Sequence, residues 1–137
     1  MTDRTAFVSM PVSDEFKAVS AATVKALEEA GYMVYRFGDK SVLAPGSYWQ
    51  SEILDALASA DVVVADVTGP RDNVIYEIGY AHGQRKPVIL IGQPNSLSTL
   101  PGYLMNYQVL LYEPDDFEEL TYLIRRSVER LTSDKAR

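Results

Sequence analysis

The chain has 137 residues, of which 47% are hydrophobic, and its formal net charge is -6 at pH 7. This length suits one compact domain with a continuous core, so we expect a single domain over residues 1–137. The sequence contains no cysteine, which excludes disulfides, thiolate metal ligands and a cysteine nucleophile. The acidic balance argues against a surface that binds nucleic acid, because such surfaces are normally basic.

No stretch of the chain approaches the ~20 consecutive apolar residues that a membrane-spanning helix needs. The N-terminal segment also lacks the basic start and long apolar run of a targeting signal. We therefore expect a soluble, cytoplasmic protein with no membrane partner.

The first elements follow a strand and helix pattern. Residues 5–10 (TAFVSM) form a short apolar run that ends before Pro11, which predicts a buried strand. Ser13 or Asp14 is a suitable cap for a helix whose apolar positions recur at helical spacing until Gly31.

A second strand over residues 32–37 is followed by a loop rich in Gly, Asp, Pro and Ser over 38–47. This loop is longer than a plain connection needs, so we interpret it as a candidate lid. The alternation of helices and strands continues to the C-terminus. It predicts a helix capped by Ser47, a strand at 61–66, a helix at 73–84, strands at 86–91 and 107–112, and a final helix. The core face of the helix after Ser47 is Ile53, Leu54, Leu57 and Ala58, and the apolar stripe of the final helix is Phe117, Leu120, Leu123, Ile124, Val128 and Leu131.

This alternation predicts right-handed crossovers and a parallel sheet covered on both faces. We expect a flavodoxin-like (Rossmann-like) α/β three-layer sandwich with a five-stranded parallel sheet in the order 2-1-3-4-5. Such sheets bind ligands at the carboxyl ends of their strands, where the strand order reverses. The residues expected at these ends are Ser9, Met10, Pro11, Asp66, Thr68, Gly92 and Gln93.

Glu77 lies in the middle of NVIYEIGYAH, about one turn into a helix that Asn73 is expected to cap. Steps of about 100° per residue place it at the flank of the apolar stripe, so we expect a partly solvated carboxylate. One interpretation is a surface residue favoured by the helix dipole. The other is a catalytic carboxylate, because Asp66 ends the preceding strand at the same edge and paired carboxylates suit acid and nucleophile roles. Asn73 at this place is also suited to reach a ribose hydroxyl.

Other side chains of this helix favour packing over chemistry. His82 is the only histidine and lies at the edge of the apolar stripe, so we expect a packing role and no metal site. Gly79 and Gly83 share one side of the helix, which predicts the close approach of a neighbouring element. Tyr76 and Tyr80 fall opposite the core, and exposed aromatic rings there predict a homodimer or a larger homo-oligomer.

Residues 60–69 (ADVVVADVTG) and 73–91 (NVIYEIGYAHGQRKPVILI) resemble the nucleoside 2-deoxyribosyltransferase superfamily, which includes N-glycoside hydrolases that act on nucleoside monophosphates. Residues 7–13 (FVSMPVS) are similar to the family's first strand and nucleotide-binding loop. The resemblance therefore covers most of the chain, and its specific motifs lie in the centre of the chain. It also implies a homo-oligomer, and we expect no cofactor.

The resemblance implies roles for individual residues. The glutamate of the family's motif, Glu77 here, attacks C1′ of the sugar as a nucleophile. An aspartate after the third strand contacts or protonates the base, and Asp66 is the nearest match, with Asp72 second. The loop after the first strand binds a 5′-phosphate, which would place Ser9 and Ser13 on that phosphate next to a helix N-terminus.

Cleavage of an N-glycosidic bond needs a carboxylate to meet the cationic C1′ and an acid to accompany the departing base. Water as the acceptor gives a hydrolase, and a second base gives a transferase. Our hypothesis is an N-glycosidic bond hydrolase or transferase that acts on a nucleoside or a nucleoside 5′-monophosphate.

Two alternatives remain, because classical transferases carry an aspartate-glycine element where this chain has RDNVIY. The form N-V-x-Y-E-x-G-x-A-H is similar to TIR-like nucleotide-binding proteins, some of which cleave NAD. The alternatives are therefore a non-catalytic TIR-like nucleotide-binding module and an NAD-cleaving TIR-like enzyme. A salt bridge from Glu77 to Arg71 or Arg36 would favour the non-catalytic module.

The segment after the first strand, SMPVSDEF, excludes two other classes of nucleotide-binding protein. It has neither G-x-G-x-x-G nor G-x-x-x-x-G-K-[ST], so an ordinary Rossmann dehydrogenase and a P-loop NTPase are excluded. A response-regulator receiver would need clustered acidic residues at the end of the first strand, where this chain has Ser9 and Met10.

Overall fold

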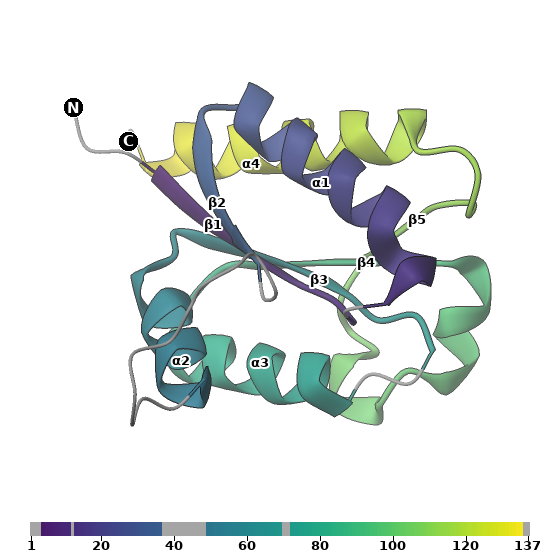
Figure 1. Cartoon of the computed structure of the whole chain (residues 1–137), viewed down its shortest axis with the longest axis horizontal. Coiled ribbons are helices and arrows are strands. Elements are labelled where there is room, and N and C mark those ends of the chain that lie inside the picture. Colours follow the sequence, from purple (N-terminus) through teal and green to yellow (C-terminus); the bar gives the residue numbers. More distant parts are fainter. Residues whose placement is uncertain (1–3, 12, 37–48, 70–71, 136–137) are drawn as a thin grey trace.

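The computed structural model describes residues 4–11, 13–36, 49–69 and 72–135. Five parallel strands form one sheet in the order β2-β1-β3-β4-β5, which confirms the predicted fold. Helices α1 and α4 cover one face of this sheet, and α2 and α3 cover the other (Figure 1). The strands are β1 (Arg4–Ser9), β2 (Tyr32–Arg36), β3 (Val62–Asp66), β4 (Val88–Gly92) and β5 (Val109–Leu111), and the α-helices are α1 (Lys17–Glu29), α2 (Trp49–Ser59), α3 (Asp72–Gly83) and α4 (Glu118–Lys135).

The candidate lid over residues 38–47, and with it the proposed cap Ser47, lies outside the described residues. The helix predicted after it begins at Trp49 in the structure. Of its predicted core face, Leu57 is fully buried and Ile53 and Leu54 are half-buried against the same cluster.

The entry into α1 differs from the prediction. A short 3-10 helix (Asp14–Phe16) precedes α1, and the Ser13 side chain makes no capping hydrogen bond. A tight 3-10 turn is a common start of an α-helix, and here it brings Phe16 into the core. The predicted stop is confirmed, because Gly31 follows the helix with a φ of 94° that favours glycine.

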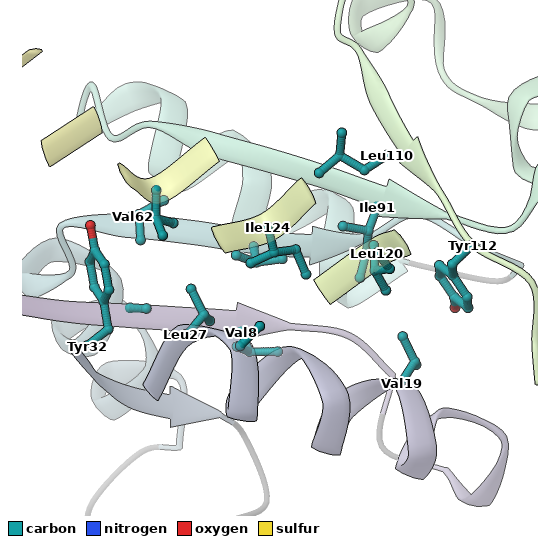
Figure 2. Close-up of a cluster of buried hydrophobic side chains, with 14 of the residues drawn as sticks. Val8, Val19, Leu27, Tyr32, Val62, Ile91, Leu110, Tyr112, Leu120 and Ile124 are labelled. Carbon is teal, nitrogen blue, oxygen red and sulfur yellow. The ribbon is translucent and has the colours of Figure 1, made fainter. Parts of the chain in front are cut away.

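The face between the sheet and the α1 and α4 helices holds the larger core (Figure 2). Side chains from the sheet and from the α1 and α4 layer meet there, and alternate strand residues contribute to it because strand side chains point to opposite faces. Its buried members include Val8, Val19, Leu27, Tyr32, Val62, Val64, Ile91, Leu110, Tyr112, Leu120, Ile124 and Val128.

The opposite face packs on α2 and α3. Phe7 and Val63, from the middle of β1 and β3, contact Leu57 of α2 and Ala81 of α3 in a second cluster. Tyr80 is half-buried against this cluster, so the prediction that its ring is exposed is wrong. The stripe of α3 that faces the sheet is broader than the sequence pattern suggested.

The two glycines of α3 do not serve close packing. A Cβ atom added to Gly79 or Gly83 would meet no atom within 4 Å outside the helix itself and the adjoining residues. The prediction of a closely approaching element is therefore wrong for the described part of the chain, and this side of α3 is open.

The connection from β4 to β5 contains two 3-10 helices, Pro94–Thr99 and Gly102–Leu104, which the sequence pattern did not predict. Leu104 is fully buried and packs against the α3 side of the sheet. Strand β5 is shorter than the predicted 107–112, because Tyr107 leaves the strand and its ring stacks on His82. The predicted packing role of His82 is thereby confirmed.

Within the described ranges, no helix combines the length and apolar character needed to cross a membrane.

Candidate active site at the carboxyl edge of the sheet

Glu77 belongs to the face of α3 that packs on the sheet. The buried residues of this helix are Val74, Glu77, Ile78 and Ala81, which recur at helical spacing. Glu77 is only 9% exposed, so the expected flank position with partial solvation is wrong. The stripe is centred between Glu77 and Ile78 rather than on Ile78 alone.

Ser9 ends β1 on the side of the sheet that faces α3. Val8 contributes to the core under α1 and α4, whereas Phe7 contributes to the core under α2 and α3. Because successive strand residues point to opposite faces, Ser9 points with Phe7 toward α3.

Ser9 and Glu77 share a short hydrogen bond. The Ser9 Oγ donates to Glu77 Oε1 at 2.5 Å, and both residues are buried. Glu77 Oε2 makes no hydrogen bond within the described residues. The carboxylate therefore has one oxygen held by Ser9 and one oxygen without a hydrogen bond in this part of the chain.

Burial raises the pKa of Glu77 above its ordinary value, and the hydrogen bond from Ser9 lowers it by a smaller amount. Burial disfavours the charged form, while a donor to the carboxylate favours it. A buried carboxyl group with a perturbed pKa is a typical feature of an active site.

Asp66 lies on the other face of the sheet. Val62 and Val64 of the same strand point into the core under α1 and α4, so strand alternation turns Asp66 in that direction. Its side chain is fully buried and accepts hydrogen bonds from the Thr68 backbone N–H at 2.9 Å and the Tyr112 hydroxyl at 2.5 Å. The structure therefore brings Ser9 together with Glu77, and places Asp66 with Tyr112.

Tyr112 lies at the carboxyl end of the sheet, beyond Ile91 and Leu110 in the cluster of Figure 2. Burial raises its pKa, and the charge of Asp66 and the hydrogen bond to it raise the pKa further, while hydrogen bonds involving Thr68 and Gln93 lower it. The hydroxyl thus stays protonated and acts as a donor to Asp66. The sequence analysis missed Tyr112, although its position at the end of the last strand was a signal that it reaches the same edge.

Thr68, Gly92 and Gln93 join this network, as their expected place at the strand ends implied. The Gln93 backbone N–H donates to Thr68 Oγ1 at 2.9 Å, and the Tyr112 backbone N–H donates to the Gly92 carbonyl at 3.0 Å. A Cβ atom at Gly92 would lie 2.6 Å from Ser96 Oγ, so only glycine fits there without displacing Ser96. These contacts tie the ends of β3, β4 and β5 together at the start of the turn that leads to α3.

The loop after β1 supplies further candidate residues at this edge. Met10 and Pro11 are half-buried, and Ser13 is exposed with a hydroxyl that does not cap the following helix.

The first turn of α3 contains Asp72 and Asn73, both exposed. The helix begins at Asp72, so the prediction that Asn73 is its N-cap is wrong. Asn73 is the last residue of a capping type before the apolar stripe, but the helical backbone already includes Asp72. The carboxylate of Asp72 therefore lies near the positive end of the helix dipole.

The structure gives no salt bridge to Glu77 within the described ranges. The Arg36 guanidinium donates instead to Ser20 Oγ of α1 at 2.7 Å, on the opposite side of the sheet, and Arg71 lies outside the described residues. In the same part of the chain, no group of three His, Asp or Glu side chains is placed to hold a metal ion.

The chain has a curated relative of similar sequence. It is 30% identical over 98 residues to a 5-hydroxymethyl-dUMP N-hydrolase from Esox lucius, a match that covers 67% of this chain and 63% of the relative. Two solved structures share its fold: a CMP N-glycosidase from Clostridium botulinum (TM-score 0.65, 19% identity, 88% of this chain and 98% of the other) and a 2-desoxiribosyltransferase from Leishmania mexicana (TM-score 0.61, 14% identity, 88% and 97%).

In sequence and in fold, the chain is similar to the nucleoside 2-deoxyribosyltransferase superfamily.

The chain spans less than two thirds of the length of the relative from Esox lucius. A TIR-STING receptor from C. gigas also shares the fold of this chain. The TM-score is 0.65 and the identity 14%, over 90% of this chain and 39% of the receptor. No family model matches the chain.

Proposed function

We propose that this protein belongs to that superfamily and cleaves the N-glycosidic bond of a nucleoside 5′-monophosphate or nucleoside, with Glu77 as the nucleophile. The observation that carries the proposal is the state of the Glu77 carboxylate, which is buried and held at Oε1 by Ser9, while Oε2 makes no hydrogen bond within the described residues. The Esox lucius relative and the Clostridium botulinum neighbour are named for cleavage of nucleoside monophosphates, which favours the phosphorylated substrate.

In the first step, Glu77 Oε2 forms a bond to C1′ of the sugar while the bond from C1′ to the base nitrogen breaks. The electron pair of the broken bond leaves with the base, which takes up one proton from solvent. The product is a glycosyl ester of Glu77 and a free neutral base.

In the second step, a water molecule attacks C1′ and the ester oxygen returns to Glu77 as a carboxylate oxygen. The water loses one proton to solvent, and the sugar leaves with a hydroxyl at C1′. A second base in place of water would receive the sugar and give a transferase. We favour hydrolysis, because the sequence relative and the Clostridium botulinum neighbour are both named as hydrolytic enzymes.

The remaining residues at this edge receive proposed roles from their position. The loop of Met10, Pro11 and Ser13 meets the sugar and its 5′-phosphate. Asp72 and Asn73 lie on the first turn of the helix that carries Glu77 and meet the base or a ribose hydroxyl.

The Asp66 network, with Thr68, Gly92 and Gln93, has a different proposed part. Its members bond to one another across the ends of β3, β4 and β5. We propose that this network shapes the surface that contacts the base. Asp66 is the residue that best matches the family's base-contacting aspartate.

We place this activity in the cytoplasm and in a homodimer or larger homo-oligomer. The exposed Tyr76 ring on α3, 51% accessible, supports a surface for a second copy of the chain.

A second candidate is a nucleotide-binding module that performs no chemistry. The raised pKa of Glu77 and the fold shared with the TIR-STING receptor favour it, because a neutral carboxyl group can orient a ligand without attacking it.

The deciding experiment incubates the purified protein with nucleoside 5′-monophosphates, deoxynucleosides and NAD, and detects free base by chromatography. We expect base release from the monophosphates, its loss in Glu77→Gln, and no change in Glu129→Gln, which alters an exposed glutamate of α4. Release from NAD alone would assign the TIR-like enzyme. Binding in a thermal-shift assay without release from any substrate would assign the non-catalytic module.

A further inference from the structure

Ser9 is a polar residue in a place that normally holds an apolar one. It ends β1, which is paired on both sides by β2 and β3, and its side chain is 1% exposed. Buried hydroxyl groups need a hydrogen-bond partner, and the partner here is Glu77 Oε1 at 2.5 Å.

A serine hydroxyl carries one proton, so it donates to one acceptor at a time. Its donation to Glu77 leaves no proton for a substrate phosphate. A donor to an ionised carboxylate makes one of the stronger hydrogen bonds in proteins, and a phosphate would have to displace it.

We propose that Ser9 is a positioning residue that holds Glu77 Oε1 and thereby leaves Oε2 as the attacking atom. This inference rests on the proposed function of Glu77 as a nucleophile. It assigns Ser9 to the reacting end of the sugar rather than to the 5′-phosphate.

The position of the hydroxyl is set by the sheet. Ser9 lies beside Ala65 in the parallel register of β1 and β3, and its side chain has a single rotatable bond before the oxygen. Glu77 reaches the same point on a longer, flexible side chain. One rigid donor therefore selects one orientation of the carboxylate, which is the condition for an aligned attack on C1′.

The same contact opposes the effect of burial. Glu77 attacks only as the carboxylate, and Ser9 is the described group that lowers its pKa against desolvation. Loss of the hydroxyl is expected to shift the acidic limb of the activity profile to higher pH.

The test compares Ser9→Ala with Ser9→Thr, which keeps a hydroxyl, and with Ser127→Ala on α4 as a matched serine control. We expect Ser9→Ala to lower kcat by about ten- to a hundred-fold, since bonds to charged groups contribute at that level. KM should stay within a factor of about two, and the acidic limb of kcat should move to higher pH. Ser9→Thr should recover most of kcat, and Ser127→Ala should match the wild type.

A second readout does not depend on catalysis. The side-chain carboxyl carbon of Glu77 is followed by ¹³C NMR during a pH titration, and its signal is assigned by its absence in Glu77→Gln. We expect the titration midpoint to be higher in Ser9→Ala than in the wild type.

The two readouts separate the failure of each proposal. An unchanged NMR midpoint, or a raised KM for monophosphates with an unchanged kcat and pH profile, would overturn the role of Ser9. If the wild type releases no base from any substrate, the proposed function fails, and the NMR midpoint alone then decides whether Ser9 controls the Glu77 carboxyl group.

Discussion

At the scale of single residues, the main feature is a glutamate placed where the helix would otherwise carry an apolar side chain. Glu77 shares the buried stripe of α3 with Val74, Ile78 and Ala81, and its burial raises its pKa. A buried carboxylate costs folding free energy when it is charged. Such a cost is typical of a site kept for function rather than for stability.

This cost has a pH dependence of known sign. Because the pKa of Glu77 in the folded chain lies above its ordinary value of 4.5, its contribution to stability is present below that value and is lost as the pH rises through the folded pKa. We expect Glu77→Gln to unfold at a higher temperature than the wild type at about pH 8, with the difference vanishing near pH 4.

Thermal unfolding followed by circular dichroism across this pH range measures the difference. A constant difference at every pH would mean that the ionisation of Glu77 does not contribute to it.

A second prediction at the scale of single residues concerns the Tyr112 hydroxyl. Tyr112→Phe removes a donor from the buried Asp66 carboxylate, and we expect a loss of about 1–3 kcal/mol in the free energy of unfolding. Tyr122→Phe is the matched control, since Tyr122 is 52% exposed on α4 and should cost less than ~0.5 kcal/mol. Chemical denaturation of both variants checks this, and equal losses would show that the bond to Asp66 is not special.

At the scale of elements, α3 links the packing of the domain to the proposed chemistry. One side of the helix carries Glu77 toward the end of β1. The open side carries Gly79 and Gly83, where an added Cβ atom would meet no atom of another element within 4 Å. The glycines are therefore not required by packing.

We expect Gly79→Ala to raise the free energy of unfolding by about 0.5–1 kcal/mol, because alanine has the higher helix propensity and the site is open. Gly31→Ala is the contrasting variant, since its φ of 94° disfavours any side chain, and it should lower stability by a similar amount. Denaturant unfolding of the two variants gives the comparison. A destabilised Gly79→Ala variant would indicate that a partner occupies this face.

The elements also differ in how visible they were in the sequence. Strands β1 and β3 and helix α3 were found within one or two residues of their observed ends, because apolar runs and helical spacing mark them directly. The 3-10 turns before α1 and between β4 and β5 were missed, since their irregular backbone follows tertiary contacts of Phe16 and Leu104 rather than a periodic pattern.

At the scale of the whole molecule, the parallel sheet separates two faces that carry different polar pairs. The α1 and α4 face encloses the larger core and receives Asp66 and Tyr112, and the α2 and α3 face receives Ser9 and Glu77. Both pairs meet at the carboxyl edge, where sheets of this class bind ligands.

The exposed ring of Tyr76 gives a prediction for the assembly. We expect sedimentation to show a dimer or larger homo-oligomer, and Tyr76→Asp to shift the mass toward the monomer by placing a charge in an apolar contact. Tyr122→Asp, on an exposed position of α4, is the control. A monomeric wild type at all concentrations would contradict the prediction.

The sequence by itself determined the fold class, the strand order and the candidate glutamate. The fold class and the candidate glutamate follow from local signals: apolar runs for the strands, helical spacing for α3 and the polar residues that end each strand. The strand order was expected because it is common in sheets of this class. Only the tertiary structure decided which of these residues meet, because strand alternation and the register between distant segments set the direction of each side chain. It paired Ser9 with Glu77 across 68 residues and Asp66 with Tyr112 across 46, and neither distance is visible in any local pattern.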